Sequence, residues 1–219
     1  LGPDGHPAKN QSMPPVPLPR RMWAGGEVEL FDPLRIGDQV RRTSTIEDIV
    51  LKQGRTGDLW FVTVGHQYET SRGLSVRERQ DIVYREAADP SAGKSVPTPA
   101  ASQDEPASTS RSIDTPPTLL FRYSAITFNG HRIHYDLPYA TEVEGYEGLV
   151  VHGPIQATLL LNLAAMSAPS GLPRKFSYRG LSPAIAGRPL LIKRGDGDRG
   201  NAFWTESEAG VRHMMGTVA

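Results

Sequence analysis

The chain has 219 residues, with 24 basic and 24 acidic side chains, so its neutral balance gives no electrostatic basis for sequence-independent nucleic-acid binding. No apolar run reaches the ~20 residues of a membrane span, and the start, LGPDGHPAKN, does not resemble a signal peptide. Cysteine is absent, which excludes disulfides, thiolate catalysis and cysteine-ligated zinc. We therefore expect a soluble, cytoplasmic protein, or a mitochondrial one in a eukaryote.

The N-terminal part of the chain predicts strands that follow an extended start. Residues 13–26, MPPVPLPRRMWAGG, are too rich in proline to form a helix. Residues 59–70, LWFVTVGHQYET, are β-branched and aromatic, which predicts a strand. Residues 74–86 fit a strand or a short helix, and we favour a strand because apolar residues alternate with charged ones.

Residues 87–117 differ in composition from the rest of the chain. They are rich in Pro, Ala, Ser and Thr and contain almost no large apolar side chain. Such a segment cannot bury enough surface to offset the entropy of ordering it. We therefore predict a disordered linker that separates an N-terminal segment, 1–86, from a C-terminal segment, 118–219.

The C-terminal segment predicts one central helix and a sheet. Residues 119–127 fit a strand or a short helix that leads into a histidine-rich motif. Residues 154–168 are apolar almost all round, Met166 included, which predicts a buried helix that begins at Pro154. The following segments read as strands of an antiparallel meander, with glycine turns between them and Phe176, Tyr178 and Trp204 in the core: 175–187, 189–195, 201–210 and 211–219. This order predicts an α+β fold in which a sheet wraps a central helix.

The stretch FNGHRIHYD, residues 128–136, is the most informative part of the sequence. Its two histidines, His131 and His134, stand three positions apart, and Asp136 follows. These three side chains could bind a metal ion, but no further ligand stands at a supporting spacing, so we predict no metal.

A second motif, LVVHGP, precedes the predicted helix. Gly153 and Pro154 follow His152 at the point where the helix should begin. Backbone N–H groups in a first helical turn are unsatisfied and favour an oxygen that carries negative charge. A carbonyl held there becomes electron-poor, and a nearby histidine can then move protons to and from water. The combination suits the hydration of an enoyl thioester.

The segments FNGHRIHYDLPYA and GLVVHGPIQATLL resemble the active-site region of MaoC-like acyl-CoA dehydratases of the hotdog fold. The resemblance is strongest to the double-hotdog branch, which includes mesaconyl-C4-CoA (3-methylfumaryl-CoA) hydratases and mitochondrial-type 3-hydroxyacyl-thioester dehydratases. It extends over nearly everything outside the linker, through PLPRRMWAGG, PLRIGD, LWFVTV, QDIVYRE and FSYRGLSPAIAG.

The resemblance implies a double hotdog, with a non-catalytic first repeat in 1–86 and a catalytic second repeat in 118–219. Nothing before Met22 can form a first central helix, because residues 1–20 are rich in glycine and proline. We therefore expect the first repeat to be incomplete and the chain to lack its N-terminal part.

In R-specific relatives an aspartate stands five positions before the catalytic histidine. Counting back from His134 gives Asn129, an amide that cannot act as a base. The resemblance therefore implies that His134 is the general acid and base, that Asn129 positions the water, and that the Gly153 N–H polarises the thioester. Asp136 is a second candidate for the water, although we favour a role in orienting a histidine or in a local turn.

Further residues are assigned weaker roles. His131 and His152 are candidate supporting residues of the same site. The arginines that could contact the phosphates of coenzyme A are Arg20, Arg21, Arg179 and Arg188.

These inferences imply an acyl-CoA or acyl carrier protein thioester as the substrate, with no cofactor beyond the coenzyme A of the substrate itself. They imply neither a nucleic-acid nor a membrane partner, and the exposed edge of an incomplete repeat leaves a homodimer open. Two alternatives remain: a non-catalytic acyl-CoA-binding hotdog module, which Asn129 permits, and a hotdog thioesterase. Both branched dicarboxylic C5 and straight-chain fatty acyl groups fit the sequence.

Overall fold

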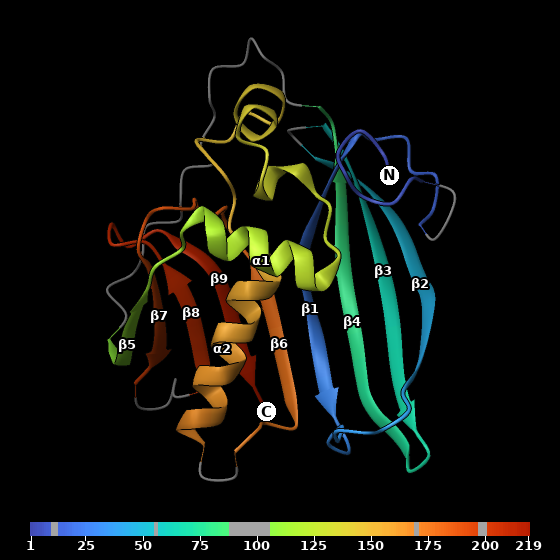
Figure 1. Cartoon of the computed structure of the whole chain (residues 1–219), viewed down its shortest axis with the longest axis vertical. Coiled ribbons are helices and arrows are strands. Elements are labelled where there is room, and N and C mark those ends of the chain that lie inside the picture. The colour runs from blue at the N-terminus through green and yellow to red at the C-terminus, as the bar shows by residue number, and fades with distance from the viewer. Residues whose placement is uncertain (10–12, 55–56, 88–105, 169–170, 197–200) are drawn as a thin grey trace.

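The computed structural model describes residues 1–9, 13–54, 57–87, 106–168, 171–196 and 201–219. The strands of these residues form one nine-stranded antiparallel sheet in the order β2-β3-β4-β1-β6-β9-β8-β7-β5 (Figure 1). The strands are β1 Arg20–Leu30, β2 Arg41–Gly54, β3 Gly57–Thr70, β4 Gly73–Arg85, β5 Ala107–Ile113, β6 Lys175–Gly180, β7 Leu190–Gly195, β8 Ala202–Glu206 and β9 Arg212–Val218. The predicted strands at 59–70 and 74–86 are therefore confirmed as β3 and β4.

Two α-helices and two short helical turns lie between β5 and β6. These are α1 Pro117–Thr127, the 3-10 turn η1 Arg132–His134, the π-helical turn η2 Tyr139–Val143 and α2 Gly153–Ser167. Helix α2 lies against the C-terminal strands, and α1 crosses near its first turn (Figure 1). The predicted helix after the HGP motif is thus confirmed. No helix in the described ranges is long and apolar enough to cross a membrane.

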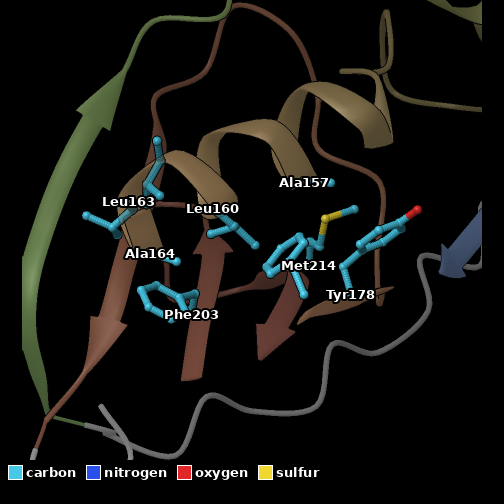
Figure 2. Close-up of a cluster of buried hydrophobic side chains, with 9 residues drawn as sticks. Ala157, Leu160, Leu163, Ala164, Tyr178, Phe203 and Met214 are labelled. Atoms are coloured by element: carbon cyan, nitrogen blue, oxygen red, sulfur yellow. The ribbon is translucent and has the colours of Figure 1, made fainter. Parts of the chain in front are cut away.

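Helix α2 and the C-terminal strands enclose the main hydrophobic core (Figure 2). Leu160 is fully buried between Phe203 and Met214, which face the helix from β8 and β9. The aromatic side chains predicted to lie in the sheet core are confirmed there: Phe176, Tyr178 and Trp204. The prediction that α2 is buried all round is wrong on one side, because the sheet covers a single face and leaves Met166 66% exposed.

The C-terminal sheet corrects two predictions. Strands β7, β8 and β9 form a meander, but β6 pairs with β9 and β1 instead of β7, so the predicted continuous meander is wrong for β6. Residues 107–113, predicted to be disordered linker, form β5 at the edge of the sheet beside β7. Most of their side chains are exposed, so backbone hydrogen bonds, and not buried apolar side chains, hold this strand in the sheet. The linker residues 88–105 lie outside the described residues.

The N-terminal strands are covered by an extended segment. Val16 and Leu18, from the proline-rich start, pack on Val62, Val64 and Tyr84 of β3 and β4. Proline fixes an extended backbone without a helix, so this segment covers the sheet as an irregular strip. In the described ranges, this strip packs on β3 and β4, whereas α2 packs on the C-terminal strands.

Strands β1 and β6 join the two sets of strands. Their register runs from Gly25 opposite Arg179 to Glu29 opposite Lys175. Trp23, just before this pairing, lies with its ring 4.7 Å from that of Tyr178. The seam therefore brings an N-terminal side chain to the C-terminal core.

Candidate active site

The histidine motif lies on a compact loop between α1 and α2. Helix α1 ends where Phe128 adopts a left-handed conformation, with φ of 52°, and the Asn129 N–H then donates to Ser124 O at 3.0 Å. The Asn129 side chain accepts a hydrogen bond from the His131 N–H at 3.0 Å through Oδ1. This turn leads into η1, which places the rings of His131 and His134 edge to face, 5.5 Å apart.

His134 is buried, and one of its ring nitrogens is committed to a backbone carbonyl. Its Nδ1 lies 2.6 Å from Val150 O, so Nδ1 carries the proton and Nε2 keeps a free lone pair. Burial lowers the pKa of His134 to about 4, although the hydrogen bond to Val150 opposes this change. The ring is therefore neutral at pH 7 and can accept a proton at Nε2.

His152, directly before α2, stacks on His134. The two ring centroids are 3.6 Å apart and the planes differ by 16°. His152 Nε2 lies 2.9 Å from the Ser124 hydroxyl, and its buried Nδ1 has no hydrogen-bond partner within the described part of the chain. Burial, followed by the charge of His134, lowers the pKa of His152 to about 3. Stacking on a second neutral ring fixes the orientation of His134.

Gly153 opens α2 beside this stacked pair. It is the first helical residue, so its N–H is one of the first-turn N–H groups that have no helical carbonyl four residues earlier to bond to. Trp23 of β1 approaches so closely that a Cβ at Gly153 would lie 2.7 Å from Trp23 Cε3. Glycine is therefore required here by the packing, and the structure brings His134 and the start of α2 together through His152.

The remaining polar residues of the motif are placed apart from this pair. Asp136 binds Arg132 at 2.8 Å and accepts the Tyr139 N–H at 3.1 Å, and these hydrogen bonds, with that from Tyr139 first, lower its pKa. Of the roles open to Asp136, the local turn is the one observed. No group of three His, Cys, Asp or Glu side chains among the described residues is arranged to hold a metal ion.

The arginines predicted to contact coenzyme A do not form one cluster. Arg188 forms a surface ion pair with Glu147 at 2.7 Å, and Arg179 is exposed on β6. Arg20 is paired with the buried carboxylate of Glu144, so its charge is used within the protein. Contacts with coenzyme A remain a prediction for Arg179 and Arg188.

Sequence reasoning missed two residues that shape the site. Ser124 holds His152 from α1, and Trp23 covers Gly153 from the other half of the sheet. Trp23 stands in the PLPRRMWAGG segment that the resemblance covers, but no local pattern indicates that Trp23 reaches Gly153 or that Ser124 reaches His152, because each contact joins residues distant in sequence.

Comparisons with known proteins bear on this geometry. A family model described as hydroxyacyl-thioester dehydratase type 2 matches residues 1–186. The chain is 46% identical over 200 residues to mesaconyl-C(4)-CoA hydratase of Chloroflexus aurantiacus, covering 91% of this chain and 70% of that protein.

Two solved structures from Mycobacterium tuberculosis are similar in fold. HtdX superposes with a TM-score of 0.66 at 18% identity, covering 90% of this chain and 74% of that chain. A conserved protein described as a double hotdog has a TM-score of 0.56 at 14% identity, with coverage of 90% and 74%. The hotdog architecture predicted from the sequence is therefore confirmed.

Proposed function

Because the chain belongs to the hydroxyacyl-thioester dehydratase type 2 family, we propose that it is a hydro-lyase that reversibly adds water to an enoyl thioester. One observation carries the proposal: the Nδ1–H of His134 is held by Val150 O, and its free Nε2 belongs to a neutral ring beside the start of α2. We assign catalysis to the C-terminal half, residues 118–219.

Two groups of the protein act in the proposed reaction, the Gly153 N–H and His134 Nε2. The Gly153 N–H binds the thioester oxygen and withdraws electrons from the conjugated double bond. His134 Nε2 takes one proton from water, the water oxygen bonds to the β-carbon, and the π electrons move onto the thioester oxygen as an enolate. The enolate then collapses as its α-carbon takes the proton back from His134. Because this sequence adds H and OH with no net oxidation, we propose no cofactor beyond the coenzyme A of the substrate.

We assign Asn129 to hold the attacking water. Its Oδ1 already accepts the His131 N–H, so the proposed contact is made by the amide nitrogen, which donates to the water oxygen. Asp136 is engaged with Arg132 and Tyr139, which disfavours it for this role.

The proposed substrate is an acyl-CoA, and the similarity to a mesaconyl-C(4)-CoA hydratase makes a branched dicarboxylic thioester the first one to test. We propose the cytoplasm, or the mitochondrion in a eukaryote, as the place of action. A homodimer is proposed through the edge strand β2, whose apolar side chains Ile46, Ile49 and Leu51 are exposed.

The test is a spectroscopic assay on a His134→Ala variant. Mesaconyl-C4-CoA and crotonyl-CoA are mixed with the protein, and loss of the enoyl thioester absorbance is followed. We expect turnover by the unaltered chain and a loss of about 100-fold or more in the variant, because proton transfer is removed.

A matched control is His66→Ala, since His66 is a buried histidine on β3 that bonds Ser44. Equal melting temperatures would show that the His134 variant is folded. Full activity of a folded His134→Ala variant would refute the assignment of His134 as the general acid and base. Release of free thiol without hydration would favour the thioesterase, and binding without turnover would favour the acyl-CoA-binding module.

A further inference from the structure

The N-terminal turn, residues 1–9, packs on the loop that carries the site, residues 128–136. The Arg132 N–H donates to Asp4 O at 2.9 Å. Gly5 has φ of +84°, and a Cβ there would lie 1.9 Å from a carbonyl oxygen of the site loop. The contact is therefore made by two backbones with no room for a side chain between them.

This turn presents a carboxylate and a histidine to the site. Asp4 Oδ2 lies 2.9 Å from His6 Nδ1, and Asp4 Oδ1 accepts the His6 backbone N–H at 3.0 Å. Both side chains are about four-fifths buried, with 18% of Asp4 and 22% of His6 exposed. The carboxylate places the proton on Nδ1 of His6, as the carbonyl of Val150 does on His134.

His6 extends a row of contacting imidazoles, of which only His134 and His152 are stacked face to face. Its ring centroid is 4.0 Å from that of His131, which meets His134 at 5.5 Å, and His134 stacks on His152 at 3.6 Å. Four of the six histidines of the chain thus form one continuous row, with Asp4 at its outer end.

The row needs a negative charge that its own loop does not supply. When His134 takes a proton from water, a cation forms in a buried place, which is costly without a counter-charge. Asn129 is neutral, and Asp136 is paired with Arg132 at 2.8 Å, whereas Asp4 is paired less closely, with Arg21 at 3.7 Å. Asp4 is close enough to act on the row, since its charge raises the pKa of His131 against the larger effect of burial.

We propose that Asp4 and His6 are positioning residues of the hydration site. The Asp4 carboxylate fixes His6, the ring of His6 contacts that of His131, and His131 in turn meets His134 edge to face. Through this row the N-terminal half supplies the carboxylate whose usual place in relatives is taken by Asn129. The inference rests on the proposed hydratase function and adds to it the source of the counter-charge.

The charged and titratable groups around the pair come from β1, η1, η2 and the site loop. Arg21 of β1 lies 3.7 Å from Asp4 Oδ2, and Arg132 of η1 donates to Pro3 O at 3.0 Å. The charge of Asp4 also acts on Tyr139 of η2, and the ring of His131 contacts that of His6 at a tilt of 36°. Burial raises the pKa of Tyr139 to about 12, so Tyr139 stays neutral from pH 4 to 8 and does not contribute to a pH dependence in that range.

The experiment compares Asp4→Asn and Asp4→Glu across pH, with mesaconyl-C4-CoA or crotonyl-CoA as the substrate. We expect Asp4→Asn to lower kcat by about 10- to 100-fold with little change in KM, by analogy with the carboxylates that orient metal-bound histidines. Loss of the negative charge should also move the acidic limb of kcat/KM to lower pH, and Asp4→Glu should restore both. A purely structural role for Asp4 would leave that limb in place.

The matched control is Asp38→Asn, because Asp38 is also paired with an arginine, Arg72, but its partners lie in the turns before β2 and β4 and not in the histidine row. Wild-type kcat and an unmoved limb in Asp4→Asn would overturn the inference. If Asp4→Asn does not fold, the tautomer of His6 in the unaltered chain, measured by two-bond ¹H–¹⁵N correlation, decides. An Nδ1–H tautomer supports the inference and an Nε2–H tautomer overturns it. Failure of the unaltered chain to hydrate either thioester would instead count against the proposed function.

Discussion

The two parts of the sheet are built from similar antiparallel strands but are covered in different ways. The C-terminal strands pack on α2, whose Leu160 is fully buried, whereas β3 and β4 pack on the extended residues 13–18. Helix α2 provides both the core contact and, at its first turn, the N–H group proposed to bind the thioester oxygen. The extended strip provides only packing. The proposed catalytic groups therefore lie on the half that has the helix, and the other half contributes single side chains at the seam.

Acidification should have the largest effect on the free energy of unfolding, because the histidine row joins the two halves. Burial lowers the pKa of His131 to about 3, of His134 to about 4 and of His152 to about 3, from 6.5. Between these values and 6.5 the unfolded chain binds more protons than the folded chain, so stability rises with pH. We expect full stability above pH 6.5 and a loss of up to about 1.4 kcal/mol per histidine for each pH unit toward 4.

Urea unfolding at pH 7, 6, 5 and 4 measures this loss. His134→Ala serves as the comparison, since removing one of the three histidines should make the pH dependence shallower. A free energy of unfolding that stays constant over this range would show that the row is not buried and neutral.

Shortening one side chain in each core should lower the free energy of unfolding by less than acidification does. The two losses should differ between the halves. Leu160→Ala should lower the free energy of unfolding by about 2–5 kcal/mol, because it leaves a cavity between helix and sheet. Val62→Ala removes fewer methylene groups under a thin strip, and we expect a loss of roughly 2 kcal/mol. Urea unfolding measures both.

Met166→Ala, at an exposed position of the same helix, is the control and should change stability by less than about 0.5 kcal/mol. If Val62→Ala proved costlier than Leu160→Ala, the contrast between a helix-packed and a strip-covered half would be lost.

Asn129→Asp should have the smallest effect and bears on which half supplies the carboxylate. We expect hydration to survive within about tenfold, because an aspartate accepts the same His131 N–H and is the residue that the family resemblance implies at this spacing. Steady-state rates with two enoyl thioesters would measure the change and any altered preference. Complete loss of activity would instead show that the amide itself is essential.

Much of the candidate site was predicted from the sequence. The HGP motif identified the start of α2, since proline and glycine signal a helix entry locally. The resemblance selected His134, which the structure places beside that helix. The strand β5 was missed, because a Ser- and Thr-rich edge strand has the composition of a linker and is held by backbone pairing with β7. The position of β6 beside β9 was also missed, since register between distant strands leaves no local pattern.

The central helix, the main strands and the histidine motif follow from local sequence, because periodicity, proline and glycine act over a few neighbouring residues. Which of these residues meet depends on long-range packing. It stacks His152 on His134, commits Nδ1 of His134 to Val150, and brings His6 and Asp4 from the far end of the chain to the same row. The physical reason is that burial and long-range packing, which set the tautomer and the pKa of each imidazole, are properties of the folded neighbourhood and not of the local segment.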